Sequence, residues 1–185
     1  MRIFILILIM LLYMRSFSQS FVPDTSINRI VLVDSTSVLN ILGKDCRNFL
    51  IEDNDRYKII VYNKDKSEKL EMIFHEGDNR NSFSEFMISK IKKGNITTHK
   101  FLILNEDHFK SARDIKLGLS QKSVELKLGF ALTQKQSTNG EVTLFFRRET
   151  NKDPIFTNYN MPIYYGEYVF RNNCLISFSF GFEEQ

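Results

Sequence analysis

The chain has 185 residues, among them 17 phenylalanines, no tryptophan and two cysteines, and it carries 25 Lys and Arg against 22 Asp and Glu. Arg2 and Arg15 lie in a predicted leader, so 23 basic residues remain against 22 acidic ones elsewhere, a net charge near +1. This balance argues against the clustered basic face that nucleic-acid binding requires. The length suits one core, or two small ones that share a sheet.

Residues 1–18 have the parts of a secretory signal peptide. Arg2 precedes an apolar run over residues 3–13, and the small residues Ser16 and Ser18 suit a cleavage site. The alternative is a membrane anchor, but a run of about 11 residues is well short of the roughly 20 that span a bilayer. We expect cleavage between Ser18 and Ser20, and a periplasmic or secreted chain with no membrane span after cleavage.

A short internal repeat divides the chain after the predicted leader into two similar halves. The segment from Asp34 to Gly43 reappears 86 residues later as the segment from Ser120 to Gly129, with a Ser, a Val, a Leu and the Gly in matching places. Asp and Ser are good N-cap residues, and a glycine ends a helix by adopting positive φ. The pattern predicts two short helices and two copies of one structural unit.

The segments after each predicted helix alternate in polarity or are short apolar runs, which indicates strands. The predicted strands are 57–62, 69–74 and 82–88 in the first half and 141–147, 167–171 and 175–180 in the second. The segments before the two caps, 30–33 and 115–119, are predicted to be extended, and an insertion in the second half is placed around 153–164. Within the connector, 99–104 predicts a strand and 106–112 one helical turn. Tight hairpin turns are predicted at 75–79 and 171–173, where Asn, Asp or Gly lies between the second and third strands of each half.

These elements predict an α+β fold. Tandem α-β-β-β repeats, over residues 19–90 and 115–185, are joined by a connector over 91–114. Because no linker rich in Pro, Ser or Gly divides them, we expect one continuous antiparallel sheet with short helices packed on one face.

The stretch from Ile115 to Gly129 resembles the opening of a cell-envelope module, in which an Ile/Leu-x-Gly-Met-Ser/Thr segment leads into a helix that ends in Leu-Gly. That module occurs in the small lipoprotein of the outer-membrane β-barrel assembly machine, and its tandem version is similar to the β-lactamase-inhibitor protein fold. Leu119 stands where the family usually has Met, and no Pro follows Gly129. The resemblance implies a protein that docks other proteins or cell-envelope components through sheet faces and loops, with no catalytic residues to carry over.

The sequence offers no pattern typical of a catalytic, metal or cofactor site. The three histidines lack ligand-like spacing: they are His75, His99 and His108. The segment 53–55 begins like a calcium loop but lacks its glycine and its closing glutamate. Cys46 and Cys174 can form a disulfide in an oxidising compartment, and the alternative is that each is a small buried thiol.

The aromatic-rich segment 151–165 is the candidate binding surface, because tyrosine in a loop offers a large contact area at low entropic cost. Its four aromatic residues are Phe156, Tyr159, Tyr164 and Tyr165. The alternative is that they cover the end of the sheet or belong to a strand. We expect a non-enzymatic binding module that docks an envelope or extracellular protein. The other candidates are a chaperone-like envelope assembly or stress factor, which requires an exposed apolar patch, and a secreted hydrolase.

Overall fold

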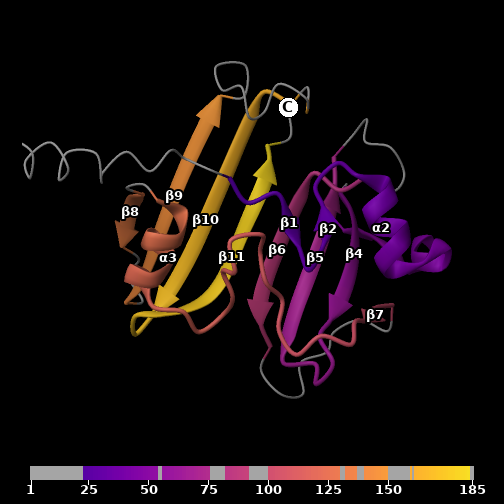
Figure 1. Cartoon of the computed structure of the whole chain (residues 1–185), viewed down its shortest axis with the longest axis horizontal. Helices are drawn as coiled ribbons and strands as arrows, with labels where there is room; N and C mark the ends of the chain where they lie inside the picture. The colour runs from indigo at the N-terminus through magenta and orange to yellow at the C-terminus, as the bar shows by residue number, and fades with distance from the viewer. Residues whose placement is uncertain are drawn as a thin grey trace, which may run out of the picture.

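The computed structural model describes residues 23–53, 56–75, 82–91, 100–129, 132–136, 140–149, 159 and 161–183. In this part of the chain, one nine-stranded, almost wholly antiparallel sheet carries short helices on one of its faces (Figure 1). The coarse expectation of a sheet-rich α+β fold is therefore confirmed. The predicted leader, residues 1–18, lies outside the described residues.

The helices are α2 (Ser35–Leu42), the 3₁₀ helix η1 (Lys44–Phe49) and α3 (Gln121–Leu128). A separate small hairpin consists of β1 (Ser26–Ile27) and β2 (Ile30–Val31). The large sheet contains β3 (Leu50–Asp53), β4 (Arg56–Tyr62), β5 (Glu68–Phe74), β6 (Glu85–Lys90), β7 (Leu102–Ile103), β8 (Thr133–Gln136), β9 (Glu141–Glu149), β10 (Ile163–Arg171) and β11 (Cys174–Phe182).

The strand order across the sheet is β3-β4-β5-β6-β11-β10-β9-β8, and β7 joins the outer edge of β4 in parallel. Each half of the chain therefore forms a four-stranded meander. The last strand of each meander, β6 or β11, pairs with the other at the centre of the sheet. In Figure 1 the first half lies on the right in indigo to magenta, and the second on the left in orange to yellow.

Both predicted helices begin and end at the expected residues. The carboxylate of Asp34 accepts the amide of Thr36 at 2.9 Å, and the hydroxyl of Ser120 accepts the amide of Ser123 at 3.3 Å. Gly43 and Gly129 follow the two helices with φ of 80° and 74°, a region that glycine adopts without a steric penalty. The helix signals are local, and this is why they can be read from sequence.

The core lies between the helix-bearing face of the sheet and the elements above it. Alternate residues of each strand point into it, and aromatic side chains dominate: Phe86, Phe146, Tyr164, Tyr168, Phe170, Phe178, Phe180 and Phe182. Val38 from α2 and Val124 from α3 join the same cluster, and so do Ile27 and Ile115. One core therefore serves both halves.

Gly166 in β10 makes room for one of these rings. A Cβ at Gly166 would lie 2.4 Å from the Phe146 ring of neighbouring β9. The two residues are register partners, so the ring lies against the bare backbone of the glycine. This close packing explains a glycine in the middle of a long strand, where the residue is otherwise unfavourable.

Several local expectations are corrected. The segment 106–112 forms no helical turn; its residue Ser111 instead makes a β-bridge with Ile27. The segment 115–119 is interrupted by a turn at Gly118, where φ is 87°. The strands β1, β3 and β8 have no counterpart in the prediction, and β10 begins at Ile163, inside the segment expected to be an insertion.

The hairpin turn between β10 and β11 agrees with the prediction. Asn172 and Asn173 have φ of 50° and 59°, as a two-residue type I′ turn requires. The other predicted turn, at 75–79, lies almost wholly outside the described residues. Among the helices that the structure describes, none has the length and apolar character needed to cross a membrane.

Candidate functional site

The second face of the sheet, which we call the open face, is the candidate functional surface. In Figure 1 both helices and the connector lie on the viewer's side of the sheet, and the open face points away. The registers align its side chains in rows across six strands. The central row runs Ile60, Glu71, Met87, Ser179, Glu167, Phe145, and the row beside it runs Lys58, Ile73, Glu85, Gly181, Tyr165, Arg147.

A polar cluster forms where β5, β6, β11 and β10 meet on the open face. The Nε2 atom of His75 lies 3.6 Å from Oε2 of Glu85. The Glu85 carboxylate and the Ser179 hydroxyl lie beside the hydroxyl of Tyr165. Burial, reinforced by the Glu85 carboxylate, raises the pKa of Tyr165 above its usual value, so this hydroxyl keeps its proton. The cluster draws its members from both halves of the chain.

A second cluster lies beside it on β4 and β5. The Glu71 carboxylate is 2.9 Å from the Lys58 ammonium and 2.7 Å from that of Lys69. Burial alone would raise the pKa of Glu71, but the hydrogen bonds and charges of the two lysines outweigh it, and the net pKa is lowered. The carboxylate therefore stays ionised at neutral pH, and its charge is compensated within the face.

Towards β9 and β10 the open face is more accessible. Phe145 is 36% exposed and Glu167 is exposed, whereas Ile60 and Ile73, towards the other side of the sheet, are only 6% and 7% exposed. The Arg147 guanidinium is paired with the Glu183 carboxylate. This end combines an exposed aromatic ring, Tyr165 and paired charges on rigid strands, which suits contact with another surface.

The structure separates the four aromatic residues predicted to bind. Tyr164 is not in an exposed loop: it lies in β10, is fully buried, and donates its hydroxyl to the Asp24 carbonyl. Tyr165 is next in the strand and so lies on the open face. Tyr159 is half-buried, with its ring 5.0 Å from that of Phe182. Phe156 lies outside the described residues.

The expectation of a single aromatic loop is therefore wrong for Tyr164, because strand alternation directs it into the core. The alternative that these aromatics belong to a strand holds for Tyr164 and Tyr165. Sequence reasoning missed His75, Glu85 and Glu71. The alternation of Lys69 to Phe74 does place Glu71 opposite the apolar residues, but the pairing of His75 with Glu85 depends on the register between β5 and β6.

The two cysteines form no disulfide with one another. Cys46 in η1 is a buried free thiol, and burial raises its pKa, which makes it less reactive. Cys174 is exposed at the start of β11. Within the described residues no three His, Cys, Asp or Glu side chains are grouped so that they could hold a metal ion. Comparison of the chain with family models, curated proteins and solved structures finds no match.

Proposed function

We propose that the chain is a secreted or periplasmic, non-enzymatic binding module that docks an envelope or extracellular protein on its open face. The observation that carries this proposal is the contrast between the two faces of the sheet. One face packs against α2, α3 and the connector in a single core. The other presents exposed Phe145, partly exposed Tyr165 and Met87, and charges that are compensated inside the face.

The physical argument is one of preorganisation. Side chains on paired strands lose little conformational freedom when a partner binds, so a rigid sheet face binds at a lower entropic cost than a loop. Tyrosine and phenylalanine supply much of the contact energy at protein interfaces. Because Glu71 and Arg147 already have partners of opposite charge, docking leaves neither of them as an isolated buried ion.

We also propose that the two halves are tandem copies of one unit. The bounds of α2 and α3, Ser35–Leu42 and Gln121–Leu128, differ by 86 residues at both ends, the same offset as the short internal repeat in the sequence. A four-strand meander follows each helix, and the central pair is β6 with β11. The unit would then be α-β-β-β-β, and the proposed relationship to the tandem β-lactamase-inhibitor and small envelope lipoprotein modules rests on this arrangement.

A crosslinked pull-down from the cell envelope tests the binding proposal. The chain from Gln19 onward, tagged after Gln185, is compared with Phe145→Asp and with the control Leu126→Asp. Leu126 is 65% exposed on α3, away from the open face. One saturable protein partner that Phe145→Asp loses and Leu126→Asp keeps would support the proposal. Many apolar clients would favour the chaperone-like factor, and equal capture by both variants would contradict docking on the open face.

A further inference from the structure

The turn between β1 and β2 contains an arginine in a backbone conformation that favours glycine. Asn28 and Arg29 have φ of 44° and 72°, the pattern of a two-residue type I′ turn. The second place of such a turn is normally taken by glycine, because a side chain there is sterically disfavoured. The backbone conformation of Arg29 is therefore sterically unfavourable for a residue with a side chain. Its exposed guanidinium extends from this tight turn.

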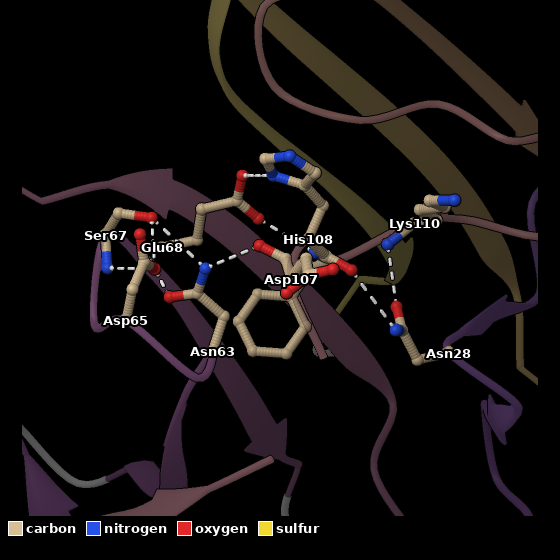
Figure 2. Close-up of polar contacts among 9 residues, drawn as sticks. Asn28, Asn63, Asp65, Ser67, Glu68, Asp107, His108 and Lys110 are labelled. Carbon is tan, nitrogen blue, oxygen red and sulfur yellow. Dashed lines mark hydrogen bonds and ion pairs between the residues drawn. The ribbon is translucent and has the colours of Figure 1, made fainter. Parts of the chain in front are cut away.

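This turn is fixed to the connector by the amide group of Asn28. Its Oδ1 accepts the amide of Lys110 at 2.7 Å, and its Nδ2 donates to the carbonyl of His108 at 3.2 Å. The backbone amide of Asn28 also donates to the Lys110 carbonyl at 3.0 Å. Figure 2 shows Asn28 facing Lys110 across these bonds.

The connector is in turn fixed to the sheet by two buried side chains of the β4–β5 hairpin, Asn63 in its turn and Glu68 at the start of β5. Glu68, 5% exposed, accepts the amide of Phe109 at 2.8 Å and lies 2.7 Å from Nδ1 of His108. Fully buried Asn63 donates to the Asp107 carbonyl at 2.8 Å (Figure 2). The β1–β2 turn and the connector are therefore held side by side in a fixed arrangement.

A groove lies between the β1–β2 turn and the connector. Its volume of about 350 Å³ is at the small end of the range for ligand pockets. Its lining comprises Ser26, Asn28, Arg29, Glu106, Lys110, Ser111 and Ala112. The side chains of Arg29 and Glu106 make no ion pair or hydrogen bond within the described part of the chain. The Lys110 ammonium lies 4.0 Å from Asp114, a loose contact between half-exposed and exposed groups.

We propose that this groove binds a small zwitterion that carries a carboxylate and an ammonium group, the chemical class of free amino acids and short peptides. The carboxylate would accept from the Arg29 guanidinium and the Lys110 ammonium, and the ammonium would donate to Glu106. Two cations and one carboxylate complement a zwitterion better than a simple anion, which Glu106 would repel. The groove lies on the helix-bearing side of the sheet, so this proposal is independent of docking on the open face.

A nuclear magnetic resonance titration of the full chain tests the proposal with three probes: glycylglycine, acetate and ethylammonium. We expect saturable shifts of the Arg29, Lys110 and Ala112 amides with glycylglycine. Because each charge-assisted hydrogen bond strengthens binding by about tenfold or more, acetate and ethylammonium should bind at least about tenfold more weakly. No saturable shift with glycylglycine, or equal affinity for acetate, would overturn the proposal.

Two variants distinguish the site from the fold. Arg29→Gly removes the guanidinium while it suits the backbone at this position, so it should weaken glycylglycine binding at least about tenfold without lowering the thermal midpoint. Glu106→Gln should weaken glycylglycine but not acetate. Lys66→Gly is the matched control, since Lys66 also has positive φ, 58°, but lies outside the groove. Equal weakening by Arg29→Gly and Lys66→Gly would overturn the assignment of the groove.

Discussion

Asp24 should make the protein less stable as the pH rises from 4 to 7, and Asp24→Asn should remove this dependence. The side chain is fully buried, its Oδ1 accepts the Arg113 amide at 3.0 Å, and its Oδ2 has no hydrogen-bond partner among the residues that the structure describes. Burial raises the pKa of Asp24 from 3.8 to about 6, and the hydrogen bonds from Ser111 and Arg113 offset only part of this effect. The native state therefore favours the neutral carboxyl.

The sign and size follow from the two pKa values. Below pH 3.8 both the folded and the unfolded chain carry the proton, so the folded state has no penalty. Between pH 3.8 and about 6 the unfolded chain ionises first, and stability falls as pH rises. Above pH 6 the penalty is constant, and the pKa difference corresponds to about 3 kcal/mol. Asn cannot ionise and escapes this penalty.

Urea unfolding of the full chain and of Asp24→Asn, at intervals from pH 4 to pH 8, measures the effect. The difference in unfolding free energy should shift by about 2.5 kcal/mol in favour of the variant across this range, because part of the roughly 3 kcal/mol penalty is already present at pH 4. Asp114→Asn is the control, since Asp114 is exposed and hydrogen bonding from Lys127 lowers its pKa; its difference should be flat from pH 5 to 8. A pH-independent difference for Asp24→Asn would refute the reasoning.

Three further predictions concern packing, capping and reactivity. Gly166→Ala should lower the unfolding free energy by about 1–3 kcal/mol, because its Cβ would collide with the Phe146 ring; an unchanged urea midpoint would contradict this packing. Ser120→Ala should lower the unfolding free energy by about 1 kcal/mol, because the N-cap hydrogen bond is lost. Urea unfolding measures this change, and an unchanged unfolding free energy would exclude a capping role. Cys174 should react with a thiol reagent in the native protein much faster than Cys46; equal rates, read by mass spectrometry, would contradict the burial of Cys46.

The elements that were predictable from sequence have local signals. Asp34 and Ser120 each accept an amide two or three residues further on, and a glycine closes each helix, so a short window of sequence contains all the information. The strands β4, β5 and β11 likewise alternate or are strongly apolar. The turn at Asn172 and Asn173 is a third case, because asparagine adopts positive φ more readily than other residues with a side chain.

The missed elements lack such signals. The strand β8 has the sequence Thr-Gln-Lys-Gln, whose polarity does not alternate, and it exists because β9 offers an edge for pairing. The start of β10 lies where the repeat predicts an insertion, around 153–164, and Pro162 and Gly166, which commonly mark turns, give no sign that a strand begins here. In the fold Gly166 instead accommodates the Phe146 ring, which is a tertiary contact that no local pattern reveals.

The candidate surface was predictable only in part for the same reason. An open sheet face follows from helices that pack on one side, and the aromatic pattern of 151–165 already points to Tyr165. The position of Tyr165 on that face, however, depends on where β10 begins, and the cluster of His75, Glu85 and Ser179 requires the pairing of β6 with β11 across the two halves. Contacts between residues so distant in sequence are set by the topology of the sheet.

The most direct test of the proposed function is site-specific photo-crosslinking in cells. A photoreactive residue is placed at Phe145 on the open face and, in a separate variant, at Leu126 on α3. If the open face docks a protein, position 145 should give one discrete crosslinked product that position 126 does not give. The same products from both positions, or none from position 145 in a folded protein, would contradict docking on the open face.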